Sequence, residues 1–280
     1  MARIIGCLAT SHVPLIGRAI ARGLQQEPYW RDFFAGYRPI HAWLEQVRPD
    51  VAVIFYNDHG LNFFLDAMPT FAVGAAEQYQ NSDEGWGLPS FGPFQGDPAL
   101  SWHLIESLME AQFDLTTCQQ MRVDHAFAIP MALAWPGHHP LRVKTVPIAI
   151  NTVQHPLPTP ERCFHLGQAV GRALEAYPQD LRVLVIGSGG LSHQLDGERA
   201  GFINQPFDQM CLDRLVSDPL ALTHLSVRDL IEQAGSQGVE LLMWLAARGT
   251  LHGRVSRIHS HYVVPISNTA AATLVLQNAA

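Results

Sequence analysis

Short apolar runs, bounded by glycine, proline or polar residues, recur along this chain of 280 residues and most constrain its fold. Such runs are typical of strands buried on both faces of a sheet. They cover residues 4–9, 51–56, 143–150, 183–186, 258–264 and 272–276. Between them lie stretches with helical character, at 40–47, 100–109, 163–177, 209–216, 227–234 and 239–247. Strands alternating with helices predict an α/β fold, with a central, mostly buried sheet flanked by helices.

The same segments indicate one domain. The loosest stretch, residues 78–96, is rich in Gly, Pro, Asp and Ser, and we expect it to form a long loop over the surface. Because the chain contains no internal repeat and no low-complexity linker, we expect residues 1–280 to form a single-domain sandwich.

The composition argues against two classes of partner. Lys and Arg total 18 against 25 Asp and Glu, a net charge of −7, whereas a nucleic-acid binder needs a basic face. The chain lacks the run of about 18 apolar residues that a membrane-spanning helix requires, and its apolar start is too short for a signal peptide. We therefore expect a cytoplasmic protein. Only 15% of the residues are charged, against about 25% in average domains, which favours a homo- or hetero-oligomer with buried apolar surface.

Histidine is the residue type that points to a functional site, with 14 in the chain. Three of them closely follow predicted buried strands, namely His12, His59 and His193. In sheets of this class, ligands bind beyond the carboxyl ends of the strands. A single histidine near a core is most often a hydrogen-bonded structural residue, but three at equivalent topological positions predict a shared site.

Glu240 is a carboxylate within an apolar segment. The helix predicted over 239–247 is largely apolar, so it should be buried, and a buried carboxylate is unfavourable unless it is paired, hydrogen-bonded or bound to a metal. We expect Ser236 to cap this helix, which places Glu240 near its first turn, where the helix dipole favours an anion. A carboxylate satisfied only by that helix end, or by an arginine such as Arg248, is the alternative to a metal ligand.

Two histidines and one carboxylate with open coordination positions form the facial arrangement of non-haem Fe(II) oxygen enzymes. The same ligand types suit a hydrolytic zinc site, so a zinc-dependent hydrolase is the alternative. Spacing alone does not decide between them, and it does not say which two of His12, His59 and His193 bind the metal. The four cysteines are far apart, without a CxxC pair, so a zinc ribbon or disulfide framework is not expected.

Other histidines form weaker candidates. His259 and His261 lie two apart in a predicted strand, so their side chains share one face of it. A polar strand face is a simpler interpretation of this pair than a metal site. His138 and His139 lie in a Gly/Pro loop and are expected to face solvent.

Two further features allow more than one interpretation. Asp124 precedes His125 and could simply orient a structural histidine. The glycine-rich turn at 187–192 suggests a phosphate loop, but it lacks both the GxGxxG pattern and a Walker lysine, which argues against nucleotide binding.

Motifs spaced over nearly the whole chain carry a family resemblance. They lie at residues 10–14, 56–59, 83–87, 123–125, 189–194, 235–240 and 265–270. With these motifs the sequence resembles the class III extradiol ring-cleavage dioxygenases, which include the beta subunit of protocatechuate 4,5-dioxygenase, gallate dioxygenase and 3-O-methylgallate dioxygenase. The resemblance implies an α/β sandwich and an enzyme that inserts O2 into the ring of a carboxylated catechol. Protocatechuate is the first substrate expected, by 4,5-cleavage to a semialdehyde, with gallate or 3-O-methylgallate next.

The resemblance also implies roles for individual residues. His12, His59 and Glu240 would hold Fe(II), and His193 would be the catalytic acid and base. His125 would lie beside the substrate, as a second catalytic and substrate-binding group, and hydrogen-bond a phenolic oxygen.

Substrate contacts are implied at the last motif, where Ser267 and Asn268 would lie near the ring carboxylate. Two departures from the family pattern lie near the pocket. Residues 88–90 read Leu-Pro-Ser in place of a Pro-Arg-Pro type sequence, and Ala126 replaces a glycine after the Asp-His pair. Both departures affect the expected identity of the substrate rather than the metal ligands.

The resemblance extends to partners. In the heteromeric enzyme a small alpha subunit covers the active site, and gallate dioxygenases carry a similar lid fused at the C-terminus. Because the chain ends at residue 280, soon after the last motif, we expect either a separate small subunit or a more open site. A non-enzymatic binding protein of the same fold is an alternative, but it should lack a ligand or the base, and all four residues are present.

Overall fold

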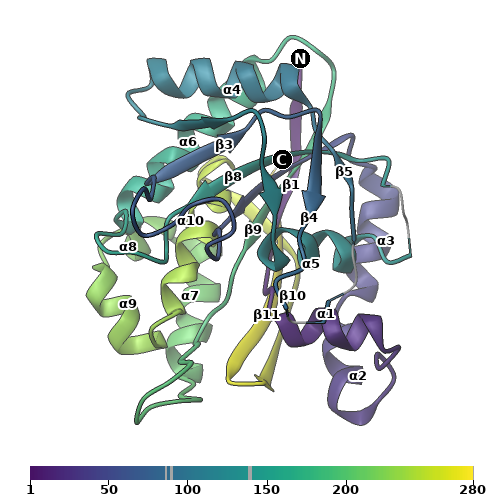
Figure 1. Ribbon diagram of the computed structural model, residues 1–280, viewed down its shortest axis with the longest axis vertical. Coiled ribbons are helices and arrows are strands. Elements are labelled where there is room, and N and C mark those ends of the chain that lie inside the picture. The colour runs from purple at the N-terminus through teal and green to yellow at the C-terminus, as the bar shows by residue number, and fades with distance from the viewer. Residues whose placement is uncertain (86, 89–90, 138–140, 280) are drawn as a thin grey trace.

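An eight-stranded mixed sheet forms the centre of the computed structural model, which describes residues 1–85, 87–88, 91–137 and 141–279 (Figure 1). The strand order is β10–β11–β1–β9–β2–β8–β3–β6. The four strands β1, β9, β2 and β8 run parallel, and a β10–β11 hairpin extends the sheet beyond β1. The strands are β1 (Arg3–Thr10), β2 (Val51–Tyr56), β3 (Phe71–Gly74), β6 (Thr116–Cys118), β8 (Lys144–Ile150), β9 (Arg182–Ser188), β10 (Val255–Ile266) and β11 (Thr269–Asn278).

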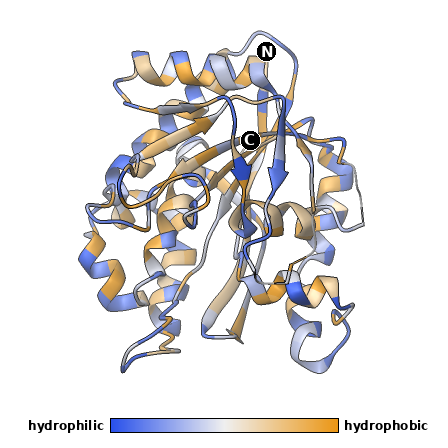
Figure 2. Cartoon of the chain, in the orientation of Figure 1, coloured by the Kyte–Doolittle hydropathy of each residue, from blue (hydrophilic) through white to orange (hydrophobic). Residues whose placement is uncertain are grey.

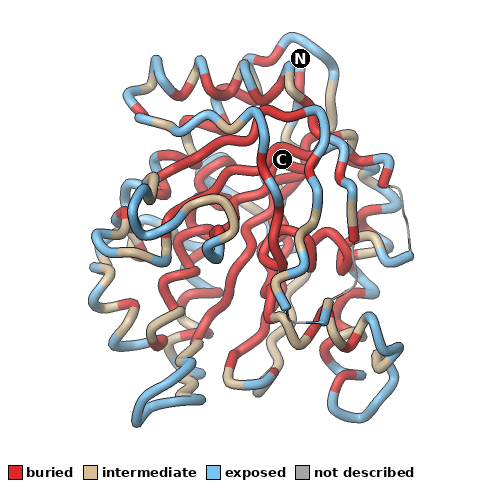
Figure 3. The backbone as a smooth tube through the Cα atoms, in the orientation of Figure 1, coloured by how far each residue is buried: buried red, intermediate tan, exposed pale blue. Residues whose placement is uncertain are grey.

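The central strands are buried on both faces because their side chains alternate between two apolar cores. In β2, Val51, Val53 and Phe55 pack into one core, and the intervening residues pack into the other. Figure 2 shows hydrophobic residues along these strands, and Figure 3 shows the buried backbone continuing through the sheet while the connecting loops are exposed. The expected α/β class, with a mostly buried central sheet, is therefore confirmed.

Helices cover both faces of the sheet, on opposite sides in Figure 1. One face carries α4 (Pro98–Glu110), α6 (Pro160–Ala176), α7 (Gln205–Ser217), α8 (Pro219–Thr223), α9 (Val227–Ala234) and α10 (Leu241–Gly249). The other carries α1 (Pro14–Ala21), α2 (Pro28–Ala35), α3 (Arg38–Val47) and α5 (His125–Ala134). None of the helices in the described part of the chain combines the length and the apolar character needed to cross a bilayer.

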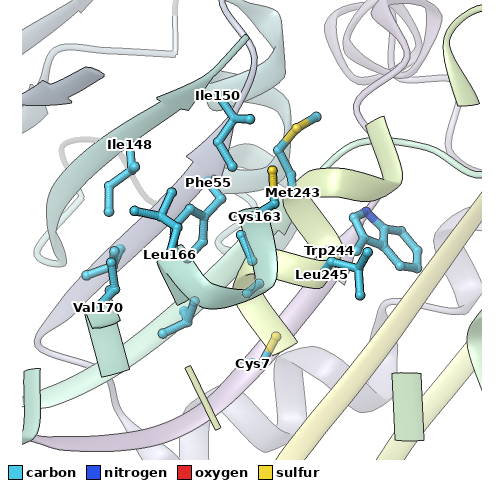
Figure 4. Packing of buried hydrophobic residues seen from close by; sticks show 14 of the residues in the cluster. Cys7, Phe55, Ile148, Ile150, Cys163, Leu166, Val170, Met243, Trp244 and Leu245 are labelled. Carbon is cyan, nitrogen blue, oxygen red and sulfur yellow. The ribbon is translucent and has the colours of Figure 1, made fainter. Parts of the chain in front are cut away.

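Helix α10 is buried along its whole length between the sheet and α6. Figure 4 shows Met243 and Leu245 of α10 in the cluster that Leu166 of α6 and Phe55 of β2 also join. Glycines allow this close packing, because a Cβ built on Gly167 would lie 1.9 Å from the carbonyl oxygen of Ala246. The contacts of α10 with α6 and with β9 therefore fix the position of the helix relative to the strands.

Several predicted segments need correction. The stretch 78–96 is not simply a loop, because β4 (Gln78–Asn81) and β5 (Phe94–Gln95) pair, and β7 (Arg122–Val123) completes a small second sheet. Sequence analysis missed α1, α2 and α5. Helix α5 is buried on all sides, so it shows no helical alternation of polar and apolar residues.

The predicted start of the helix over 239–247 was also wrong. Gly235 ends α9 with a positive φ of 93°, and Ser236 makes no capping bond, because its hydroxyl donates to the side chain of Gln237. The segment instead begins with a 3-10 turn, Gly238–Glu240, and Glu240 immediately precedes α10. The helix end thus positions Glu240 without a serine cap.

Candidate functional site

A cavity of about 410 Å³ opens at the carboxyl ends of β1, β2 and β9. Its wall contains all the imidazole and carboxylate groups to which the sequence assigned a role, namely His12, His59, His125, His193 and Glu240. The strand ends bring three of these histidines together, as parallel topology predicts.

His12 follows β1 and is 4% exposed. Its Nδ1 lies 2.8 Å from Ser188 Oγ at the end of β9, and that hydroxyl donates its own proton to the carbonyl oxygen of Ala126. Ser188 must therefore accept from His12, so Nδ1 carries the ring proton. The lone pair of His12 is left on Nε2, which lies 3.4 Å from Glu240 Oε1.

His59 follows β2 and is fixed in the same way by a carboxylate. Asp124 Oδ2 accepts from both the backbone N–H and Nδ1 of His59, each at 2.9 Å. Nε2 of His59 lies 3.1 Å from Asn57 Nδ2, which donates to it in the neutral ring, and 3.9 Å from Glu240 Oε1. Desolvation alone would lower the pKa of His59, but the carboxylates of Asp124 and Glu240 raise it to about 10, so a metal ion at Nε2 would take the place of a proton. Burial opposes the charge on Asp124, yet the hydrogen bond from His59 brings its pKa down to about 2.

Glu240 is only 4% exposed and reaches the cavity because Gly189 lets the two segments approach closely. A Cβ on Gly189 would lie 2.7 Å from the carbonyl oxygen of Glu240. Arg248 is not its partner, because that guanidinium donates to the carbonyl oxygens of residues 215, 252 and 253. Burial opposes ionisation of Glu240, but the proximity of His12 and of the other imidazoles holds its pKa well below the usual range.

The donor set fits a divalent metal ion. A carboxylate as buried as Glu240 is unfavourable without a cation, and it faces two imidazole nitrogens that are already oriented by other residues. Asn57 donates from Nδ2 toward Glu240 Oε1 at 3.4 Å, while its buried Oδ1 has no hydrogen-bond partner among the described residues. His12, His59 and His125 also bring ring nitrogens within 4.8 Å of one another, so a second, overlapping donor set exists.

His193 lies in the loop after β9, opposite the start of α10. Its backbone N–H donates to Ala234 at 2.6 Å, and its carbonyl accepts from Gln237 at 3.0 Å. The preceding Ser192 donates from both its N–H and its hydroxyl to Asp208, which is buried. Desolvation lowers the pKa of His193, so its ring is held neutral and can accept a proton.

His125 is the first residue of α5, and its ring stacks on that of His59 with 4.3 Å between centroids. Its own carboxylate partner is Glu84, which accepts from the backbone N–H at 2.8 Å and from Nδ1 at 2.9 Å. Desolvation and the charge of His59 lower the pKa of His125, against the opposing effect of Glu84.

The remaining candidates lie outside the cavity wall. Ser267 and Asn268 form the turn between β10 and β11, where Ser267 N donates to Tyr29 and Asn268 Nδ2 donates to the carbonyl oxygens of residues 194 and 195. Their neighbour Thr269 lines the cavity. This turn therefore lies at the rim of the site, beside Leu195.

Of the other histidines, His155 also lines the cavity, although the sequence assigned it no role, whereas the pair on β10 lies elsewhere. His259 and His261 share one side of β10, as expected, and His261 faces Asp32 of α2 at 3.7 Å. His138 and His139 lie outside the described residues, as do three of the residues in 83–90 that were singled out for the family motif and its departure.

Sequence analysis missed the residues that orient the imidazoles, namely Ser188, Asp124, Glu84 and Asn57. Asp124 was noticed only as the neighbour of His125, whereas it orients His59 across 65 positions. Asn57, Glu84 and Asp124 lie in the motifs at 56–59, 83–87 and 123–125, but nothing in those motifs indicated which ring each of them would contact.

Comparison with known proteins bears on this site. A family model described as "Catalytic LigB subunit of aromatic ring-opening dioxygenase" matches residues 6–274. A gallate dioxygenase of Pseudomonas putida is 42% identical over 70% of this chain. A 2,3-dihydroxyphenylpropionate/2,3-dihydroxicinnamic acid 1,2-dioxygenase of a Rhodococcus species is 31% identical over 87% of this chain and 88% of its own length.

The chain matches only part of the length of some of these relatives. The chain spans 58% of the length of the gallate dioxygenase and 55% of a Photorhabdus laumondii relative that is 35% identical. Among solved structures, an uncharacterized protein from Escherichia coli K12 aligns with a TM-score of 0.58, covering 98% of this chain and 100% of that one. At 14% sequence identity, this likeness shows the fold alone.

Proposed function

This chain belongs to the family of catalytic LigB subunits of aromatic ring-opening dioxygenases, and on that premise we propose that it is a non-haem Fe(II) extradiol dioxygenase. The observation that carries the proposal is the convergence of two oriented imidazoles and one buried carboxylate on a cavity that three further imidazoles also line, those of His125, His155 and His193. Residues 1–280 would act as one catalytic domain.

His12, His59 and Glu240 are the proposed ligands of Fe(II). Both imidazoles present Nε2 to the carboxylate because Ser188 and Asp124 occupy their Nδ1 atoms. His125 fits this role less well than Glu240. Its ring stacks on that of His59, so the in-plane lone pairs of the two rings run side by side rather than toward one point.

Bound at these ligands, Fe(II) would supply the redox chemistry that lets a catechol react with O2, with open coordination positions for both. The residues around it perform the acid–base and positioning steps. His193 would take a phenolic proton from the bound substrate and return it later in ring cleavage. His125 would contact a phenolic oxygen from the opposite part of the wall. Apolar residues such as Val13, Leu157 and Val239 keep water from the ring.

The proposed substrate is a carboxylated catechol, with protocatechuate expected from the sequence and gallate favoured by the gallate dioxygenase relative. No lysine or arginine lines the cavity among the residues that the structure describes. The carboxylate would therefore be bound by neutral donors such as Gln237 and Thr269, with Ser267 and Asn268 contributing from the rim.

A small alpha subunit is the proposed cover of the site, in a cytoplasmic hetero-oligomer. Two apolar side chains of the cavity wall are unusually accessible, since Val153 is 45% exposed and Leu195 is 51% exposed. A subunit seated on this mouth would bury both and close the cavity to water.

The test is anaerobic reconstitution of the chain with Fe(II), followed by oxygen uptake with protocatechuate, gallate, 3-O-methylgallate and catechol, with and without a candidate small subunit. We expect oxygen uptake with a carboxylated catechol and a yellow, ring-opened product. An intradiol diacid product, or hydrolytic activity with zinc and no oxygen uptake, would contradict the proposal.

A further inference from the structure

The pairing of Glu84 with His125 determines which ring nitrogen of His125 faces the cavity. Glu84 Oε2 lies 2.8 Å from the backbone nitrogen of His125, and Glu84 Oε1 lies 2.9 Å from Nδ1 of the same residue. An ionised carboxylate only accepts hydrogen bonds, so in the neutral ring the proton must be on Nδ1. Nε2 is then an unprotonated acceptor on the side of the ring that Glu84 leaves free.

The surroundings hold this arrangement in place. His125 is 4% exposed, the side chain of Glu84 is 12% exposed, and the ring is stacked against His59. Among the described residues His125 lines the cavity, whereas Glu84 lies behind it. Glu84 therefore acts on a bound molecule only through the histidine.

We propose that Glu84 is a positioning residue that makes His125 a hydrogen-bond acceptor, and that the site consequently selects an aromatic ring with a free hydroxyl, rather than an O-methyl group, facing His125. This inference rests on the proposed function and deepens it by naming the substrate class. A hydroxyl donates to Nε2, whereas a methyl ether offers only an oxygen acceptor and leaves two acceptors facing each other.

The variant Glu84→Gln should move the ring proton of His125 from Nδ1 to Nε2, with little change in the shape of the side chain at position 84. The backbone N–H of His125 can only donate, so it fixes the amide oxygen on its own side and turns the amide NH₂ toward Nδ1. His125 must then accept at Nδ1 and carry its proton on Nε2. In that state it can donate to a hydroxyl and a methyl ether alike.

The first experiment uses ¹⁵N-histidine NMR of the metal-free chain at about pH 8, above the usual pKa of histidine. The His125 signals are assigned by their loss in His125→Phe. We expect a protonated Nδ1 and a bare Nε2 in the wild type, and the reverse in Glu84→Gln. A wild-type ring with its proton on Nε2 overturns the proposal, whether or not the chain proves to be a dioxygenase.

The second experiment compares gallate and 3-O-methylgallate, which differ in one methyl group, as probes of the Fe(II)-loaded protein. We expect kcat/KM to favour gallate by at least about tenfold in the wild type, the scale of leaving one polar group unpaired. In Glu84→Gln the preference should fall to within about threefold, and Glu84→Asp should retain it at reduced rates.

Asp83→Asn is the matched control, since Asp83 lies in the same loop and, among the described residues, accepts only from the backbone of Gly85 at 2.8 Å. It should leave the preference unchanged. If Glu84→Gln lowers kcat/KM equally for gallate and 3-O-methylgallate, so that the wild-type preference remains, Glu84 merely supports the loop and the proposal is wrong. An absence of oxygen uptake with every catechol contradicts the proposed function instead, and the NMR result then decides the role of Glu84.

Discussion

The two ends of the same parallel strands are built from different interactions. At the amino end, Arg182 at the start of β9 forms a bidentate ion pair with Asp50, which precedes β2, and opposite charges are matched one to one. At the carboxyl end, several imidazoles surround a single buried carboxylate, Glu240, with no arginine or lysine on the described cavity wall. At the amino end the charged groups pair with each other. In the proposed function, the polar groups at the carboxyl end instead bind a cation and a substrate.

This difference predicts that the carboxyl end of the sheet determines activity, and that the core and the amino end determine the stability of the fold. Changes at the carboxyl end should reduce activity and leave the fold intact, whereas changes in the core and at the amino end should reduce the free energy of unfolding and leave turnover per folded molecule unchanged. Each variant below tests one side of this division.

The largest effect is expected for Glu240→Ala. Removing the carboxylate that faces both His12 and His59 should abolish retention of Fe(II), and activity with it. Metal analysis after desalting and oxygen uptake measure the two effects. Full iron occupancy together with full activity would remove Glu240 from the ligand set.

His193→Phe should preserve the metal and reduce kcat by about 10²–10⁴, the usual range for loss of a general acid or base. The ring of His193 lines the cavity wall, so a phenylalanine should be accommodated there. Iron content and kcat are measured together. Loss of iron with this variant would mean that His193 is a ligand and that one of the proposed ligands is the base.

In the core, Gly167→Ala should destabilise the fold by about 1–3 kcal/mol, the usual cost of overpacking. The new methyl would lie 1.9 Å from the carbonyl oxygen of Ala246, so α6 and α10 must separate. Urea denaturation measures the loss. Gly253→Ala is the control, because no atom lies within 4 Å of its added methyl. Equal stability of the two variants would contradict the close packing of these helices.

The smallest effect is expected for Asp50→Asn at the amino end. Hydrogen bonds from Arg182 lower the pKa of Asp50 below its usual value, while burial acts in the opposite direction. Because the pKa is depressed in the folded state, the stabilisation is present above the unfolded value, about 4, and is lost as pH falls through the lower folded value. The Tm of wild type and variant should therefore differ at pH 7, begin to converge below about pH 4, and meet below the folded pKa of Asp50. A difference that grows in acid would contradict this.

Much of the division between the two ends was predictable from sequence. The apolar runs that form β1, β2 and β9 are continuous, so both their burial and the positions of His12, His59 and His193 at their carboxyl ends followed from the pattern. Helix α5 was missed because it is buried on every side and therefore shows no periodicity.

The partners of the imidazoles could not be read from the sequence. Asp124 stands next to His125 in the chain but bonds to His59, and Glu84 reaches His125 across 41 positions. These contacts depend on how the loops after β2, β4 and β7 meet in space. Sequence patterns identify residues at strand ends, but long-range packing decides which side chain orients which ring.

The central claim is that one ferrous ion is held by His12, His59 and Glu240. The most direct measurement is anomalous X-ray scattering at the iron edge from crystals grown anaerobically with Fe(II). We predict a single strong peak within bonding distance of both Nε2 atoms and of Glu240. A peak within bonding distance of His125 or His193, and not of Glu240, would contradict this claim.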